Sequence, residues 1–179
     1  MRRRFLVAVL TIAVCVLIVS STIGREIFSG RQPGLVSFGI VHFAGYLFFL
    51  LMPVEALVPY YLAEGHAGGV LIVLAVVTAL AAQGIDYGIG RMLASTVINK
   101  VIGVERYERY RGKIDRWGSW AIFVFNLFPL SSPNMLLVAG MTRFSAVRAF
   151  AYSLTGLLLK YVGIVYVFDA TGWLMGDLP

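Results

Sequence analysis

The chain has 179 residues, 59% of them hydrophobic, and a mean hydropathy of +0.84. So apolar a composition excludes an ordinary soluble domain and indicates a single all-α polytopic membrane domain. The formal net charge of +6 does not indicate nucleic acid as a partner, because the basic residues gather beside apolar runs. One cysteine and two histidines without neighbouring ligands predict no metal site, and no cofactor is expected.

The first apolar run, Phe5 to Ile23, follows three arginines and is nearly long enough to span a bilayer. It ends without a clear small-residue cleavage site, so a retained signal anchor is favoured over a cleaved signal peptide. We therefore assign residues 1–33 to an N-terminal anchor and outer loop, residues 34–168 to a core, and residues 169–179 to a C-terminal tail.

The second apolar run, Gly34 to Ala63, is interrupted by Pro53 and Pro59, with Glu55 between them. Proline removes a backbone donor, and irregular backbone at membrane depth needs protein cover or a wet cavity. The run therefore predicts a re-entrant hairpin that turns near Pro53. Because an ionisable group there is costly, Glu55 is a candidate proton carrier. The alternative is that Glu55 only caps the returning half-helix.

Val70 to Gly90 predicts a full transmembrane span, in which Gln83 and Asp86 share one helix face. Asp86 is a second candidate to carry a proton or cation, and the alternative is an interfacial carboxylate near the inner end of the span. The basic segment that follows, Arg91 to Trp117, predicts an amphipathic helix on the cytoplasmic membrane surface.

A second broken segment runs from Gly118 to Gly140 and contains Pro129 and Pro133, which predicts a second re-entrant hairpin. Hydroxyl and amide side chains crowd this break, where they can satisfy backbone groups that the prolines free. The same side chains are candidates for contact with a headgroup: Asn126, Ser131, Ser132 and Asn134.

The last long run, Ala146 to Phe168, predicts a third span with Lys160 well inside it. Lys160 shares a helix face with small and polar residues, as expected for a bundle interior: Ser153, Gly156 and Gly163. We expect a buried cation that contacts a phosphate or pairs with Glu55. The alternative is a lysine that snorkels to an interface.

The distribution of arginine and lysine predicts the topology, because basic residues near membrane ends mark the cytoplasmic side. It places the N-terminus and the segment Arg91 to Trp117 inside and the C-terminus outside. The two hairpins then enter from opposite faces, each followed by a full span, which is the inverted-repeat pattern of many transporters. A rival with Gly34 to Met52 as a complete span would place the basic segment outside.

Three motifs carry a resemblance to a known family. They are Pro53-Val54-Glu55-x3-Pro59 followed by Gly65, then Asp86-Tyr87-Gly88-Ile89-Gly90-Arg91, then Phe125-x3-Pro129 with Ala139-Gly140-Met141 and Phe144 downstream. In order and spacing they resemble the DedA or VTT membrane proteins, as a divergent branch, over about Gly34 to Phe168. The resemblance implies lipid transport in a prokaryotic plasma membrane, by phospholipid scrambling or by flipping of polyprenyl-phosphate carriers, and proton coupling in some members.

The chain also departs from the pattern of that family. Asn126 and Ser132 stand where many members have arginine, Gln83 aligns with a common aspartate, and Lys160 replaces a frequent aromatic. From the neighbouring helix, Lys160 could supply the charge that the missing arginines would carry.

The favoured function is therefore a lipid flippase or scramblase with membrane lipids as partners, and a homo-oligomer is compatible with the sequence. A small-solute or ion transporter could use the same hairpins. An enzyme acting on lipid phosphates is disfavoured, because the sequence shows no cluster of histidine, serine and arginine and no paired aspartates. A noncatalytic scaffold is the remaining alternative.

Overall fold

The computed structural model describes residue 17 and residues 20–30, 32–47, 54–96, 104–128 and 132–176, and all regular structure in these ranges is helical. The expected all-α class is thereby confirmed. The chain forms two compact units. Unit 1 comprises residues 1–79 and 163–179, and unit 2 comprises residues 80–162. Two long helices, α5 (Gly68–Thr96) and α8 (Ala146–Gly176), each begin in one unit and end in the other.

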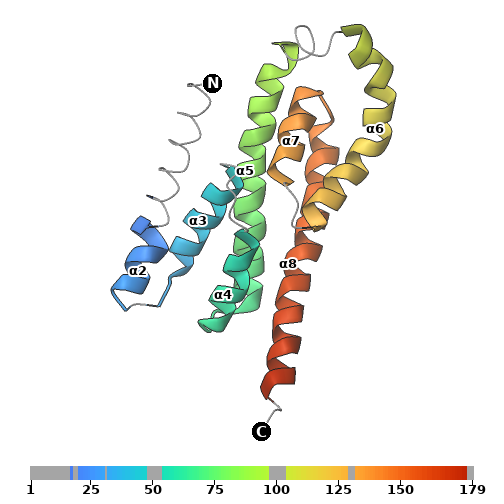
Figure 1. The fold of residues 1–179 in the computed structure, drawn as a ribbon. Coiled ribbons are helices and arrows are strands. Elements are labelled where there is room, and N and C mark those ends of the chain that lie inside the picture. The colour runs from blue at the N-terminus through green and yellow to red at the C-terminus, as the bar shows by residue number, and fades with distance from the viewer. Residues whose placement is uncertain are drawn as a thin grey trace, which may run out of the picture. The chain divides into compact units, whose positions relative to one another are not determined.

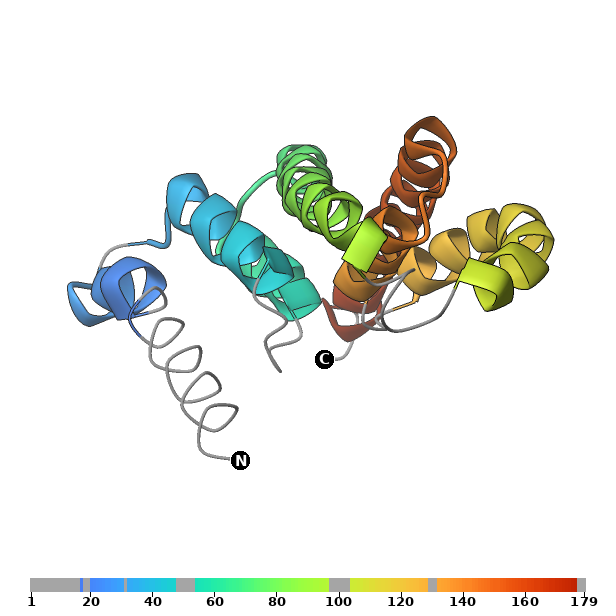
Figure 2. The same cartoon turned by 90° about the horizontal axis from the view of Figure 1, so that it is seen from above.

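Unit 1 contains the first broken segment. After η1 (Ser20–Gly24) and α2 (Arg25–Phe28), the chain forms α3 (Leu35–Leu47), η2 (Val54–Ala56) and α4 (Leu57–Ala63). The helices α3 and α4 lie beside each other and run antiparallel (Figures 1 and 2). A Cβ at Gly45 would lie 2.1 Å from Val54 Cγ1, so the end of α3 packs tightly against the start of the returning helix.

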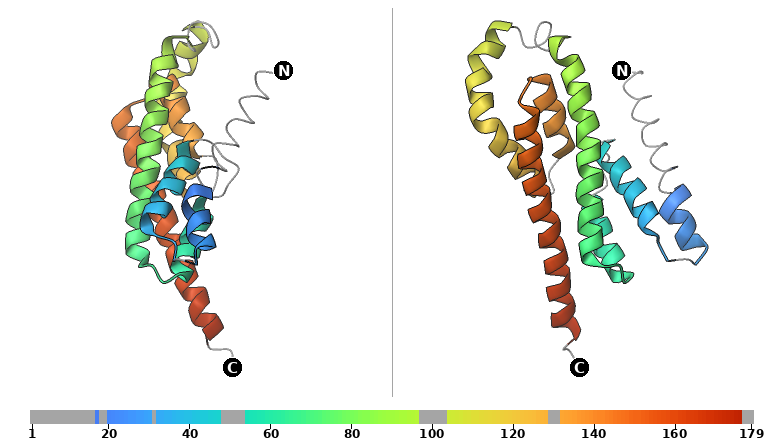
Figure 3. Two further views of the ribbon diagram at one scale, coloured as in Figure 1. Left: turned by 90° about the vertical axis from the view of Figure 1, so that its left-hand side faces the viewer. Right: turned by 180° about the vertical axis from the view of Figure 1, so that it is seen from behind.

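Unit 2 contains the second broken segment, formed by α6 (Val104–Leu127) and α7 (Ser132–Met141). The helix α7 runs antiparallel to α6 and lies beside both α6 and α5 (Figures 1 and 3). Glycines permit this contact, because a Cβ at Gly90 would lie 2.1 Å from the carbonyl oxygen of Leu137. An apolar core fills the space around α7, made of Ile122, Leu136, Ala139, Phe144 and Ala149.

Both returning helices end in the same hydrogen-bonded turn. After α4, the amide of His66 donates to the carbonyl of Tyr61, and the amide of Gly65 donates to the carbonyl of Leu62. After α7, the amide of Phe144 donates to the carbonyl of Ala139, and the amide of Arg143 donates to the carbonyl of Gly140. This pair of bonds defines a Schellman motif, whose central residue adopts a left-handed conformation. That residue is Gly65 (φ 87°) in unit 1 and Arg143 (φ 55°) in unit 2. The next long helix starts three residues later in each case.

Two of the described helices are long and apolar enough to cross a membrane, Gly68–Ser95 and Ala146–Thr171. They correspond to the second and third predicted spans. Most of the first predicted span, Phe5 to Ile23, lies outside the described residues. The hairpin tips at residues 48–53 and 129–131 also lie outside them, so the re-entrant hairpins and the inverted repeat stay predictions.

The expected helix boundaries at glycines were wrong. The helix α5 continues six residues past Gly90 and so includes the first residues of the basic segment. The helix α6 runs unbroken through Gly118, so residues 104–117 of the basic segment and the first arm of the second hairpin are one helix. Gly118 lies inside α6 and makes room for the ring of Phe144, because a Cβ added at Gly118 would lie 3.1 Å from this ring. At the other end of the chain, α8 continues past Asp169 to Gly176, where the sequence suggested a separate tail.

Two of the four prolines in the broken segments lie at the start of described helices. Pro59 is the third residue of α4 and Pro133 the second residue of α7. Proline is tolerated in the first turn of a helix, where its missing N–H would have no intrahelical partner. Both therefore sit where helices start, and neither interrupts one. Pro53 and Pro129 lie outside the described residues.

Candidate functional site

A chain of hydrogen bonds joins α5, α6 and α8 inside unit 2. Gln83 Nε2 donates to Asn126 Oδ1 at 2.6 Å, Asn126 Nδ2 donates to the carbonyl of Ile122 at 2.8 Å, and the hydroxyl of Ser153 donates to Gln83 Oε1. The side chains of Gln83, Asn126 and Ser153, which we call the amide cluster, are completely buried. The cluster satisfies polar groups in the core without introducing a charge.

Close helix packing holds the amide cluster in place. A Cβ at Gly156 would lie 2.7 Å from the carbonyl oxygen of Phe123 and 2.9 Å from Asn126 Cβ. Only a residue without a side chain allows α8 to approach α6 at this distance. Gly156 lies three residues after Ser153, so the same face of α8 provides both the hydroxyl and the close contact.

Asp86 lies one helical turn beyond Gln83 on the same face of α5 and is 5% exposed. Its Oδ2 atom is buried and has no hydrogen-bond partner among the described residues. A buried carboxylate oxygen without a partner is costly, so such a group takes up a proton, a cation or water. Asp86 is therefore the residue of this region best suited to exchange a proton or cation.

Lys160 is also 5% exposed and lies on the face of α8 that carries Ser153 and Gly156. Its Nζ atom lies 5.1 Å from the centre of the Tyr161 ring, a distance at which a cation is attracted by an aromatic face. The structure thus places Lys160 in the interior of the helix bundle. Gly163, which was expected on the same buried face, is exposed.

The amide cluster separates the two charged residues. In unit 2, α5 and α8 run antiparallel (Figure 1), so Asp86 and Lys160 lie on opposite sides of the contact between Gln83 and Ser153. Asp86 lies three residues beyond Gln83, and Lys160 lies seven residues beyond Ser153 in the opposite direction. At 1.5 Å per residue, the two charged residues are therefore offset by roughly 15 Å along the helix axes. A direct ion pair between Asp86 and Lys160 is excluded by this separation.

The polar residues lie near mid-span. Gln83 is near the middle of the candidate span Gly68–Ser95, and Lys160 is near the middle of Ala146–Thr171. Polar side chains at such positions face the interior of a helix bundle or a water-filled path, because lipid cannot solvate them.

Glu55 belongs to unit 1, where it is half-buried in η2, directly before the start of α4. The N-cap residue of α4 is Ala56, which makes no side-chain capping hydrogen bond. The position at the head of the returning helix agrees with the sequence. The pairing of Glu55 with Lys160 and the role of Glu55 as a proton carrier stay predictions.

The other expected headgroup contacts lie outside what the structure describes. Ser131 is outside the described residues, and the side chains of Ser132 and Asn134 are not described, although both residues belong to the first turn of α7. Of the four polar residues near the second break, the structure therefore places only Asn126, in the amide cluster.

A cluster of aromatic and histidine side chains in unit 1 was not expected. Phe38, His42 and Tyr46 stack along α3, with ring centres 5.3 Å and 5.0 Å apart, and Tyr61 of α4 packs edge-on against Phe38 at 5.1 Å. His42 Nδ1 lies 2.7 Å from Thr78 Oγ1 of α5. The spacing of four residues along α3 was a visible signal for one helix face. Only the fold shows that the face meets α4 and α5.

Within the described residues, no three histidine, cysteine, aspartate or glutamate side chains lie close enough together to hold a metal ion. Comparison with known proteins gives one positive result, since the family model of the VTT domain matches residues 33–170. Neither a curated protein nor a solved structure matches the chain.

Proposed function

Because the chain belongs to the VTT-domain (DedA) family of membrane proteins, we propose that it moves lipids across the bilayer as a flippase or scramblase. Its substrates are phospholipids or polyprenyl phosphates, whose charged headgroup must cross about 30 Å of hydrocarbon. The protein supplies a polar route for the headgroup, while the acyl tails remain in the lipid.

The observation that carries the proposal is the buried polar region of unit 2 at mid-span. Asp86, whose Oδ2 atom has no hydrogen-bond partner in the part of the chain that the structure describes, lies on one side of the amide cluster, and Lys160 lies on the other. Burial of an aspartate and a lysine in the middle of two apolar helices is costly, and proteins retain such residues chiefly for transport or proton transfer. A purely structural role would be met by the amide cluster alone.

The departures from the family pattern support a division of roles. Gln83 stands where members commonly have aspartate and Asn126 where many have arginine, and these two residues are hydrogen-bond partners at 2.6 Å. A neutral amide pair thus occupies a position where a charged pair is common. In this chain the charged residues lie on either side of the amide cluster. Asp86 is one turn beyond Gln83 along α5, and Lys160 is two turns beyond Ser153 along α8. We assign the phosphate contact to Lys160 and the exchange of a proton or cation to Asp86, with Glu55 as a second proton carrier.

The test compares lipid movement in vesicles that contain the purified protein. Fluorescent phosphatidylglycerol and phosphatidylcholine in the inner leaflet are protected from a membrane-impermeant quencher until they cross. Lys160→Met should slow the anionic lipid at least tenfold and the zwitterionic lipid less, because only the charge is removed. Thr155→Val, on an exposed part of α8, is the matched control and should keep both rates.

The same assay separates the remaining residues and the rival functions. Asp86→Asn and Glu55→Gln are nearly isosteric and should lower the rate and flatten its dependence on pH. Equal rates for both lipids in the wild type and in Lys160→Met would remove Lys160 from the mechanism. Release of headgroups would identify an enzyme instead, and flux of a trapped solute without lipid movement would identify a solute transporter.

We also propose that the protein lies in the plasma membrane with its N-terminus and the start of α6 in the cytoplasm, because the basic residues are distributed that way. A cysteine introduced at Lys113, in a background without Cys15, should react with an impermeant thiol reagent only after cell lysis. Labelling of intact cells from outside would overturn the proposed orientation.

A further inference from the structure

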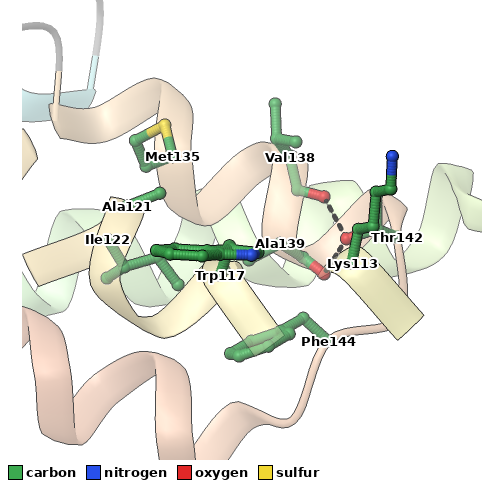
Figure 4. A pocket seen from close by; sticks show the side chains of 10 residues that line it. Lys113, Trp117, Ala121, Ile122, Met135, Val138, Ala139, Thr142 and Phe144 are labelled. Carbon is green, nitrogen blue, oxygen red and sulfur yellow. Dashed lines mark hydrogen bonds between the residues drawn. The ribbon is translucent and has the colours of Figure 1, made fainter. Parts of the chain in front are cut away.

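An apolar groove of about 310 Å³ runs between α6 and α7, entirely within unit 2 (Figure 4). Its walls are formed by Trp117, Ala121 and Ile122 of α6 and by Met135, Val138 and Ala139 of α7. Among these, Trp117 and Val138 are 65% and 48% exposed, so the groove is open at its side. It is separate from the amide cluster, none of whose residues line it.

The two ends of the groove differ in polarity. Lys113 and Thr142 lie at one end, and Ile122 and Met135 lie at the other (Figure 4). Because α6 and α7 are antiparallel, this order is the same on both walls. The nine residues from Lys113 to Ile122 span about 13 Å along α6. The hydroxyl of Thr142 already donates to the carbonyl of Val138 at 2.9 Å, so Lys113 provides the charge at the polar end.

The polar end belongs to the basic part of α6. From Glu105 to Arg116 this helix carries five basic and three acidic residues, a net charge of +2. Basic segments beside a membrane attract anionic lipids, and tryptophan is enriched at the level of the headgroups. Trp117 lies along the groove between its charged and apolar ends (Figure 4). The groove therefore has the polarity of an amphiphile, with a cation at one end, hydrocarbon at the other and an indole between them.

We propose that this groove binds the first half of one acyl chain of an anionic phospholipid, with the phosphate beside Lys113 and the middle of the chain near Ile122 and Met135. Ligand pockets commonly have volumes of roughly 300–1,000 Å³, so the groove suits a single chain segment and is too small for a whole two-chain lipid. The second chain then remains in the bilayer. The site requires a membrane protein but does not require lipid transport, because a resident lipid would use the same contacts.

The experiment uses the full-length protein in vesicles that contain phosphatidylglycerol or phosphatidylcholine with a photoreactive diazirine at the middle of one acyl chain. After illumination, mass spectrometry of peptides locates the attached lipid. We expect attachment concentrated on the parts of α6 and α7 around Ile122 and Met135, at least threefold stronger with phosphatidylglycerol. Uniform attachment along the exposed faces of α5 and α8 would indicate surrounding bilayer lipid only and would overturn the proposal.

Two pairs of variants with matched controls test the contacts. Ala121→Phe fills the groove and should reduce attachment at least fivefold, whereas Val124→Phe, on the same helix but outside the groove, should not. Val138→Phe fills the groove from α7 at a half-exposed position and gives the same test if Ala121→Phe does not fold. Equal attachment in Ala121→Phe and Val124→Phe, or in Val138→Phe and the wild type, would refute the site.

Lys113→Gln should abolish the preference for phosphatidylglycerol, while Arg116→Gln, which removes the same charge from an exposed position outside the groove, should retain it. A preference unchanged in Lys113→Gln would refute the headgroup contact. In a separate experiment, linkage of Lys113 to a second copy of the chain by a bifunctional amine-reactive reagent, together with loss of lipid attachment, would show that the groove is an oligomer contact and would refute the lipid site. Because attachment is read without any transport, loss of lipid movement with normal attachment would refute the proposed function and leave this site intact.

Discussion

In unit 1 the first helix of the broken segment, α3, contacts the long helix α5 through a histidine. In unit 2 the first helix of the broken segment, α6, contacts the long helix α8 through an asparagine. His42 contacts Thr78 of α5 at 2.7 Å, and the helices leave room, since a Cβ at Gly39 would lie 3.9 Å from Thr78 Cγ2. Asn126 lies against Gly156 of α8, where an added Cβ would lie only 2.9 Å from Asn126 Cβ. The first contact is loose and joins a histidine to a threonine, and the second is tight and places a glycine against the backbone of Phe123 and the Cβ of Asn126.

The difference shows that two helix pairs followed by the same kind of turn can have different interiors. In both units the described residues form a first helix, a short returning helix, a Schellman turn and the start of a long helix, although the residues at the turn differ. Among the described residues, the buried charged side chains at mid-span, Asp86 and Lys160, lie in unit 2 near the amide cluster, while unit 1 buries rings around α3. We therefore expect substitutions in the amide cluster to affect stability and transport together, and substitutions in the aromatic cluster to affect chiefly stability.

The largest expected effect comes from restoring charges in the amide cluster. Gln83→Asp and Asn126→Arg each place an unpaired charge at a fully buried site, and each should lower the free energy of unfolding by about 3–5 kcal/mol. The double variant should recover at least half of this loss, because the two charges then form a pair. Chemical unfolding in detergent micelles measures all three.

The matched change in unit 1 is Thr78→Val, which removes one hydrogen-bond partner of His42 and should cost only about 1–3 kcal/mol. In unit 2, if the double variant Gln83→Asp with Asn126→Arg is no more stable than the less stable of its two single variants, positions 83 and 126 are not energetically coupled.

Packing gives the next largest effect. Gly156→Ala should destabilise the protein by about 1–3 kcal/mol, because its Cβ meets the backbone of Phe123 at 2.7 Å. Gly163→Ala on the same helix meets nothing within 4 Å and should stabilise by up to about 1 kcal/mol through helix propensity. Gly39→Ala, at the looser contact of unit 1, should be tolerated. Thermal unfolding of the three variants tests the order, and similar melting temperatures would contradict the contrast between the two contacts.

The smallest effect concerns the two turns. Gly65→Ala should cost about 1–2 kcal/mol, since a left-handed conformation is unfavourable for a residue with a Cβ. Arg143→Gly relieves that cost in unit 2 and should change stability by less than about 1 kcal/mol, because glycine also gains freedom in the unfolded chain. If Gly65→Ala is neutral, the turn of unit 1 does not require its glycine. Denaturant midpoints measured in the same micelles provide the comparison.

The sequence predicted the helical class, the two long apolar helices and the burial of Lys160, because composition and periodicity act within one segment. It misplaced two helix boundaries, at Gly90 and Gly118, for the same reason. Glycine is a weak signal for a helix end, and at Gly90 and Gly118 it instead permits a close approach of Leu137 and Phe144. Nothing within the segment distinguishes a glycine that ends a helix from one that contacts a neighbour.

By itself, the sequence determined the membrane class, the family and the polar residues that lipid cannot solvate, because hydrophobicity and local motifs are properties of short stretches of chain. The tertiary structure alone decided which polar residues are partners. Gln83 and Asn126 lie 43 positions apart, and Gln83 and Ser153 lie 70 apart. Hydrogen bonds between such distant residues depend on how three helices pack, and packing is set by the shapes of all their side chains together. For the same reason, Asp86 Oδ2 lacks a hydrogen-bond partner among the described residues only in the folded chain, where burial removes the water that would otherwise solvate it.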